Sequence, residues 1–414
     1  MDSNSRTAKS IKNSSIALTF YVCSLLLQFF SRRILIEVLG DEILGLNSTI
    51  LNILQFLNLA ELGISSAVGF TLYRPLHTKD YQTICEVVTL QGYLYRKIAI
   101  IIIIGSIIVC ALFPYIFAKI SLPLWYAYAS FAVLLLSALL GYFVNYKQIV
   151  LTASQQDYKI IYSYRSIMLL KIIAQMAAVY YLKYPYVWWL ILEAVFSIIG
   201  SLSLYITTKR TFPFLKDVDR SFASLRSQYN EFTKKIKQLF VHKIGRFALT
   251  QSAPLIIYAY TNLTLVTYYS NYLVITNGVI ILVSATFNSM TAGIGNLVAQ
   301  GDTSKNLSFF FELFNLRFLI ISTICFTLFY IIPGFINVWL GQEYNLPTTT
   351  LLLIISSLYI TLSRMTVDAY IDVYGIFQDI YAPIIETILN IGLSVLLGYL
   401  YELNGILSEV LISQ

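Results

Sequence analysis

The stretch Lys97–Ala118 reads KIAIIIIIGSIIVCALFPYIFA and carries no charged side chain after its first residue. A helix needs about 20 consecutive apolar residues to cross the hydrocarbon core of a bilayer. Backbone polar groups within lipid must be hydrogen-bonded inside the protein, which leaves helices and closed barrels as spanning structures. A barrel strand needs only about 9–11 residues. The length of this stretch therefore predicts a transmembrane helix.

The composition of the whole chain extends this prediction. Of the 414 residues, 57% are hydrophobic and only 12% are charged, and the mean hydropathy is +0.72. Soluble domains carry about 25% charged residues. The shortfall excludes an ordinary soluble domain and predicts an all-α polytopic membrane protein.

Apolar runs recur along the chain at lengths that suit transmembrane helices. We predict spans near residues 14–36, 43–70, 97–118, 124–146, 160–182, 186–208, 243–261, 265–298, 313–338, 350–371 and 380–401. The final residues, Gly405–Gln414, are interpreted as the start of a twelfth helix that is cut short.

The distribution of basic residues predicts the orientation. If the N-terminus is cytoplasmic, most of the 28 Lys and Arg residues fall in cytoplasmic segments or close to them, as the positive-inside rule requires. The net charge of +7 then sets topology and meets anionic lipid headgroups. It does not indicate nucleic acid as a partner.

One long polar segment divides the chain. We predict an N-terminal lobe of six helices over residues 1–208, a basic cytoplasmic linker over 209–242, and a C-terminal lobe over 243–414 with five full helices and the start of a twelfth. In the linker, apolar residues recur at helical spacing: Tyr229, Phe232, Ile236, Leu239 and Phe240. This pattern predicts an amphipathic helix that lies in the membrane interface or packs against the lobes.

A weak similarity relates the two halves. His77–Leu90 can be set against Gln300–Leu313, so that Asp80 and Asp302 fall one position apart. Repeats of this kind relate the lobes of many transporters that rock around a midplane site. The similarity predicts two pseudo-symmetric six-helix lobes around a central cavity.

Enzymatic chemistry has no visible basis in the sequence. The four cysteines have no metal-site or disulfide spacing, and the two histidines, His77 and His242, are far apart in the sequence. No glycine-rich phosphate loop precedes a Lys-Ser/Thr pair. We therefore predict no catalytic residues, no metal and no cofactor.

Polar residues at membrane depth are the main candidates for function, because they are costly unless they face protein or water. Six basic residues are predicted to hold an anionic headgroup in a cationic cavity: Arg32, Arg33, Arg165, Lys171, Arg246 and Arg364. Eight further residues are predicted to form a polar cavity wall or a coupling-ion site: Asn52, Gln55, Asn58, Glu61, Glu193, Asp368, Asp372 and Glu386.

A packing role competes with the binding role at each charge, since a neighbouring helix can neutralise it. Arg364 and Asp368 are four residues apart, so they share a helix face and a structural ion pair is favoured there. For Arg32, Arg33 and Lys171 the binding role is favoured, because no acidic residue is obviously placed to neutralise them locally. The two adjacent arginines can also reach the interface as snorkelling side chains.

Several short motifs, in order along the chain, resemble the bacterial polysaccharide flippases of the O-antigen type, within the multidrug/oligosaccharidyl-lipid/polysaccharide exporter superfamily. They are LG at Leu39-Gly40, LGLN at Leu44–Asn47, ELGI at Glu61–Ile64, LYRPL at Leu72–Leu76, HKIG at His242–Gly245, YSNY at Tyr269–Tyr272, PGFINVWLG at Pro333–Gly341, and Gly375, Asp379, Pro383, Glu386, Asn390 and Ser394. Together they cover essentially the whole chain.

The resemblance implies an activity and a location. Two lobes would enclose a cationic cavity and alternate access across the bacterial inner membrane. They would carry undecaprenyl-pyrophosphate-linked oligosaccharide repeat units to the outer face for surface polysaccharide synthesis. The implied partners are the lipid-linked oligosaccharide, membrane lipids, and the polysaccharide polymerase and glycosyltransferases of the pathway. Coupling to H⁺ or Na⁺ is also implied.

Three departures from the family keep other interpretations open. Relatives often carry an acidic residue in the seventh span, where this chain has Thr250–Pro254 without one. A Gly-Thr is common where this chain has Ser408-Glu409-Val410, and the chain stops inside the twelfth helix. The alternatives are a drug/cation antiporter of the same superfamily and an inactive truncated paralogue.

Overall fold

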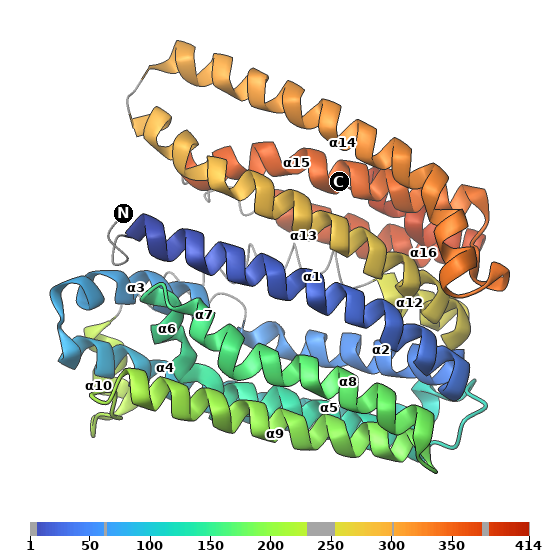
Figure 1. The fold of residues 1–414 in the computed structure, drawn as a ribbon, viewed down its shortest axis with the longest axis horizontal. Helices are drawn as coiled ribbons and strands as arrows, with labels where there is room; N and C mark the ends of the chain where they lie inside the picture. The colour runs from blue at the N-terminus through green and yellow to red at the C-terminus, as the bar shows by residue number, and fades with distance from the viewer. Residues whose placement is uncertain (1–5, 62–63, 230–252, 300–301, 375–380, 414) are drawn as a thin grey trace. The chain divides into compact units, whose positions relative to one another are not determined.

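The computed structural model describes residues 6–61, 64–229, 253–299, 302–374 and 381–413 (Figure 1). Every regular element among these residues is a helix, and they contain no β-strand. This confirms the predicted all-α fold. The chain divides into two compact units, Met1–Ile244 and Gly245–Gln414.

The first unit is built from long helices joined by short helical pieces. The long helices are α1 (Arg6–Leu39), α2 (Asp41–Leu57), α3 (Ile64–Thr78), α4 (Tyr81–Ile116), α5 (Trp125–Phe143), α8 (Ser166–Tyr181) and α9 (Pro185–Thr211). The short pieces are η1 (Asn58–Glu61), η2 (Asn145–Gln148), α6 (Ile149–Ala153), α7 (Asp157–Ile160), η3 (Ile161–Arg165) and α10 (Phe222–Gln228).

The second unit has fewer described elements. They are α12 (Ala253–Tyr260), α13 (Leu263–Ala299), α14 (Thr303–Trp339), η4 (Gln342–Tyr344), α15 (Thr348–Tyr374) and α16 (Tyr381–Ser413). The α16 backbone is non-helical at Tyr401 and Glu402. Beyond this turn the chain packs back on α16, where Asn390 Nδ2 and Ser394 Oγ donate to Glu409 at 2.5 and 2.7 Å.

The protein is a multi-pass membrane protein. Eight helices of the described ranges are long and apolar enough to cross a membrane. The span expected over 43–70 was wrong as one continuous helix, because α2 ends at Leu57 and a 3₁₀ turn separates it from α3. The span expected over 160–182 is likewise interrupted, by the π-turn Ile161–Arg165. Most of the span expected over 243–261, and most of the expected amphipathic helix, lies outside the described residues.

The two aspartates that the internal similarity aligned have the same structural role. Asp80 caps the N-terminus of α4 and accepts a hydrogen bond from Thr83 N at 3.1 Å; Asp302 caps α14 and accepts from Lys305 N at 3.1 Å. The Thr83 hydroxyl and backbone N–H lower the pKa of Asp80, and the backbone N–H and ammonium of Lys305 lower that of Asp302. Each carboxylate satisfies a donor that the first helical turn leaves unpaired.

The core of the first unit lies between α3, α4 and the short pieces after α5. Buried apolar residues from these elements form one cluster, including Val68, Leu72, Ile84, Tyr146 and Leu151. The middle of α4 instead exposes a row of isoleucines (Ile100, Ile101, Ile104, Ile107 and Ile108). In a membrane-spanning chain, such a row is the lipid-facing side of the helix.

Gly200 allows α8 and α9 to pack closely. A Cβ at this position would lie 2.7 Å from Met168 Cε and 3.2 Å from Tyr164 Cδ2, whereas a Cβ at Gly141 would meet no atom within 4 Å. The Met168 methyl group can move aside, so the cost comes from the Tyr164 ring, and we expect Gly200→Ala to lower the free energy of unfolding by about 1 kcal/mol. Gly141→Ala is the matched control and should be neutral or stabilising, since alanine favours helix. Denaturant unfolding in detergent measures both, and equal effects would contradict the packing argument.

Candidate functional site

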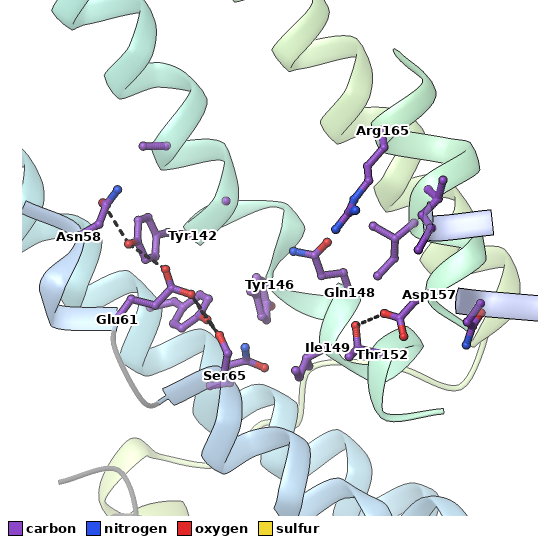
Figure 2. Close-up of a pocket in the computed structure, with 18 of the residues that line it drawn as sticks. Asn58, Glu61, Ser65, Tyr142, Tyr146, Gln148, Ile149, Thr152, Asp157 and Arg165 are labelled. Atoms are coloured by element: carbon purple, nitrogen blue, oxygen red, sulfur yellow. Dashed lines mark hydrogen bonds between the residues drawn. The ribbon is translucent and has the colours of Figure 1, made fainter. Parts of the chain in front are cut away.

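A cavity of about 730 Å³ lies within the first unit, a size that suits a small-molecule site. Figure 2 shows its polar side chains in two groups on either side of Tyr146. The lining residues come from α1, η1, α3, α4, α5 and the short pieces that follow α5: Asn13, Ser14, Ala17, Asn58, Glu61, Ser65, Gln91, Tyr95, Ala138, Gly141, Tyr142, Tyr146, Gln148, Ile149, Thr152, Asp157, Ile160, Ile161 and Arg165.

Glu61 is the centre of the first group. Its Oε1 accepts hydrogen bonds from Tyr95 at 2.7 Å and from Ser65 at 3.1 Å, and its Oε2 accepts from Tyr142 at 3.1 Å. The Tyr142 hydroxyl also reaches Asn58 Oδ1 at 3.1 Å. Within the described residues, no basic group lies within 4.0 Å of the Glu61 carboxylate. Three hydroxyls thus hold a carboxylate at a cavity wall without a paired cation.

The 3₁₀ turn at the end of α2 explains why only part of the expected polar row lines the cavity. Residues three apart eclipse one another in a 3₁₀ helix, so Asn58 and Glu61 face the same way. In the α-helix before the turn, residues three apart drift around the axis. Asn52 is buried and donates to Ser48 O at 2.8 Å, and Gln55 is exposed. Neither Asn52 nor Gln55 therefore lines this cavity.

The second group of polar side chains lies around Arg165. This residue is the last of the π-turn Ile161–Arg165, a distortion that recurs at functional sites. Its side chain points toward Gln148 (Figure 2). Nearby, Thr152 donates to Asp157 Oδ1 at 2.8 Å. The charged residues that line the cavity are thus two carboxylates, Glu61 and Asp157, and one guanidinium, Arg165.

Gln91 and the tyrosine rings complete the wall. Gln91 is 1% exposed, and its Oε1 has no hydrogen-bond partner among the residues that the structure describes. The Tyr95 ring meets the rings of Tyr142 and Tyr146 edge-on, with centroids 5.3 and 6.4 Å apart. A buried unpaired acceptor is costly. The cavity therefore suits a ligand that donates hydrogen bonds or carries positive charge, such as a hydroxyl-rich ring or a cation.

The two adjacent arginines of α1 do not line this cavity. Arg33 Nε pairs with Glu37 Oε1 at 3.0 Å, and both side chains are more than half exposed. Arg32 interacts electrostatically with Asp41, in the first turn of α2. The expectation that no acidic residue neutralises them was wrong.

Lys171 is paired as well. Its Nζ lies 2.7 Å from Glu193 Oε1, with side chains 16% and 9% exposed. Gln175 donates to Glu193 Oε2 at 3.0 Å. The absence of a partner for Lys171 was wrongly predicted, because Glu193 comes from α9, the helix packed on α8, and only the tertiary structure brings the two together.

In the second unit, Arg364 has an ion pair that the sequence did not predict. Arg364 Nη1 lies 2.5 Å from Glu386 Oε1 on α16. The side chain of Asp372 and the whole of Arg246 lie outside the described residues.

Two buried charged residues of the second unit were not among the sequence candidates. One is Glu409, held by Asn390 and Ser394. The other is Arg317, which is 4% exposed. Its guanidinium donates to Thr366 at 3.1 Å and lies 4.4 Å from the Phe287 ring centroid. The available signal was its position four residues inside the span predicted over 313–338.

No model of a known protein family matches the chain, and no curated protein matches it. The solved structures that share its fold include the following three. An inward-facing multidrug resistance MATE family transporter of the MOP superfamily is 13% identical, with 97% of this chain and 94% of that chain covered and a TM-score of 0.68. A MOP superfamily transporter from Pyrococcus furiosus, for which a reversed pocket polarity suggests a different function, is 14% identical over 98% and 92%, with a TM-score of 0.66.

The third is a MATE protein in a bent conformation, 13% identical over 98% of this chain and 92% of that chain, with a TM-score of 0.59. The chain therefore has the fold of MATE family transporters of the MOP superfamily.

Proposed function

We propose that this chain is a membrane transporter that flips undecaprenyl-pyrophosphate-linked oligosaccharide repeat units across the bacterial inner membrane, with its N-terminus in the cytoplasm. The observation that carries the proposal is the polar cavity of about 730 Å³ inside a membrane-spanning helical unit. Polar groups at membrane depth are functional by default, because they are otherwise too costly. The MATE-type fold supports membrane transport, and the ordered flippase-like motifs support a lipid-linked glycan as the cargo.

The cavity chemistry suits the sugar part of such a cargo. Sugar hydroxyls donate hydrogen bonds to carboxylates and amides, and Glu61, Asp157 and the unpaired Gln91 Oε1 supply these acceptors. Tyrosine combines an apolar ring with a polar hydroxyl, as a sugar ring requires. The pyrophosphate is less suited to the Glu61 side. Arg165 is the basic candidate that lines the cavity, and we assign it to the phosphate end of the cargo.

Coupling to H⁺ or Na⁺ is part of the proposal. Glu61 is partly buried and no described basic group lies within 4.0 Å of its carboxylate, so it is our candidate for the coupling-ion site. The proposed cycle includes no catalytic step and no cofactor. Its partners are the lipid-linked oligosaccharide, membrane lipids and the polymerase and glycosyltransferases of the same pathway.

A drug or cation exporter is the second candidate function. The observation in its favour is the excess of carboxylates over basic groups among the charged residues that line the cavity. An organic cation can sit on tyrosine faces, and Glu61 would be its counterion.

Deletion and complementation separate the two functions. In a bacterium lacking the gene, we expect surface glycan to fall and lipid-linked repeat units to accumulate, and the plasmid-borne gene should reverse both. Glycan is measured by gel profile and lipid-linked intermediates by mass spectrometry. Normal glycan in the deletion strain, together with increased sensitivity to cationic drugs, would overturn the flippase and favour the exporter.

A further inference from the structure

One face of α4 forms hydrogen bonds and a cation–π contact with the segment that follows α9. The face carries Glu86, Thr89, Tyr93 and Lys97, here called the α4 stripe. These residues are three or four positions apart, so they lie on one side of the helix. Residues 212–229, here called the strap, follow α9 and contact every member of the stripe.

Glu86 is the main attachment point. It is 2% exposed, and its carboxylate accepts from Arg220 Nη1 at 3.0 Å, Gln228 Nε2 at 3.1 Å and Tyr229 Oη at 2.8 Å. The Tyr93 hydroxyl donates to the Arg220 carbonyl at 3.2 Å. A buried carboxylate needs such partners to be tolerated. A fourth donor, Gln82 Nε2 at 3.1 Å, lies on α4 itself. The other three belong to the strap, so undocking of the strap would leave Glu86 with one of its four hydrogen bonds.

The protonation of Tyr229 supports this arrangement. Burial and the hydrogen bond to Glu86 raise the pKa of Tyr229 to about 12. Its hydroxyl therefore keeps its proton and donates at every physiological pH.

Further along the stripe, backbone and ring contacts continue the attachment. Thr89 Oγ1 accepts from Val218 N at 3.0 Å, so a side chain of α4 satisfies a backbone donor of the strap. Lys97 Nζ lies 3.6 Å from the ring centroid of Phe222, a favourable cation–π distance. The strap is thus fastened along several turns of α4.

The strap also contacts the wall of the cavity. Tyr146 lines the cavity, and its hydroxyl reaches Asp217 Oδ1 at 3.5 Å, while the adjacent Lys147 Nζ lies 2.8 Å from the same oxygen. Burial lowers the pKa of Lys147, but the hydrogen bonds and charges of Asp217 and Tyr146 together outweigh burial and raise it, so Lys147 keeps its positive charge. The Tyr146 ring packs so closely on Gly92 that a Cβ there would lie 3.1 Å from it.

We propose that the docking of the strap on the α4 stripe depends on whether the cavity is occupied. The strap is the last described part of the first unit. A cavity ligand that displaces the Tyr146 ring disturbs the Asp217 contacts and loosens the strap. An empty cavity leaves Tyr146 in place and the strap docked on the α4 stripe.

Cys85 is a native reporter of strap docking. It is 9% exposed, and its thiol donates to Phe214 O of the strap at 3.4 Å. Replacing Cys23 and Cys110 by serine leaves Cys85 and Cys325 as the remaining thiols. Cys325 is 5% exposed and belongs to the second unit, so it reports global unfolding. The experiment compares the maleimide alkylation rates of the two thiols in detergent-solubilised protein by mass spectrometry.

Both ends of the proposed link can be perturbed. Glu86→Gln removes the charge that holds Arg220, and we expect it to raise the Cys85 rate roughly tenfold, the change that corresponds to about 1.4 kcal/mol. Tyr229→Phe removes one hydrogen bond and should give a smaller increase. Gly92→Ala pushes the Tyr146 ring as a ligand would, and should also raise the Cys85 rate. The Cys325 rate should stay constant in all three.

The control and the contrary results are well defined. Glu42→Gln alters a carboxylate that accepts from Ser121, away from the strap, and should leave both rates unchanged. Parallel increases at Cys85 and Cys325, or no increase in Glu86→Gln and Tyr229→Phe, would overturn the docked strap. A wild-type Cys85 rate in Gly92→Ala would overturn its coupling to the cavity. The assay needs no transport, so it is independent of the proposed function.

Discussion

Lys171→Ala should lower the free energy of unfolding of the first unit by about 3–5 kcal/mol, the usual cost of removing one partner of a buried ion pair. The pair with Glu193 is 2.7 Å long, and its side chains are 16% and 9% exposed. Without the ammonium, Glu193 keeps only the hydrogen bond from Gln175. Denaturant unfolding in detergent, followed by intrinsic fluorescence, measures the loss.

Two comparisons identify the cause of that loss. Lys171→Met combined with Glu193→Gln removes both charges and keeps an acceptor for Gln175, so it should recover most of the stability. Arg33→Ala breaks an ion pair of similar length whose side chains are 54% and 56% exposed, and it should cost no more than about 1 kcal/mol. If the double variant were as unstable as Lys171→Ala, the unpaired charge would not be the reason.

Glu61→Ala is expected to reduce transport at least tenfold while the protein level stays normal. Hydrogen bonds to a charged group contribute about 1.5–3 kcal/mol each, and the hydroxyls of Ser65, Tyr95 and Tyr142 share this one acceptor. Its removal leaves the cavity wall without its organising group. Restoration of surface glycan in the deletion strain, normalised to membrane-inserted protein, measures the effect.

The choice of substitution separates charge from geometry. Glu61→Gln keeps an acceptor for the hydroxyls but loses the negative charge, so an ion-coupled cycle should still fail in it. Glu42→Gln changes a carboxylate of the same unit outside the cavity and should transport normally. Full transport by Glu61→Gln would remove Glu61 from the coupling step, and full transport by Glu61→Ala would remove it from the site.

Much of the fold was predictable because its cause is local. The run Lys97–Ala118 is long and apolar enough to predict a transmembrane helix from its own residues. Each such run can be recognised without knowing which helices pack against it. The capping aspartates Asp80 and Asp302 act on backbone groups three residues away. The break after Leu57 was not predicted. Polar side chains at Asn58 and Glu61 indicate that this part of the helix is unfavourable in lipid, but they do not indicate which type of turn accommodates them.

The sequence by itself determined that this chain is a helical membrane protein, that its polar residues at depth require protein or water around them, and that the stretch after α9 is polar. Only the tertiary structure decided which charged side chains form ion pairs between packed helices and which line a cavity. Lys171 and Arg364 each form an ion pair with a carboxylate 22 residues away on a neighbouring helix. Glu61 instead accepts hydrogen bonds from three hydroxyls and pairs with no described cation. The physical reason is that an ion pair in a low-dielectric interior depends on distances of a few ångströms between helices, and helical periodicity within one segment carries no information about them.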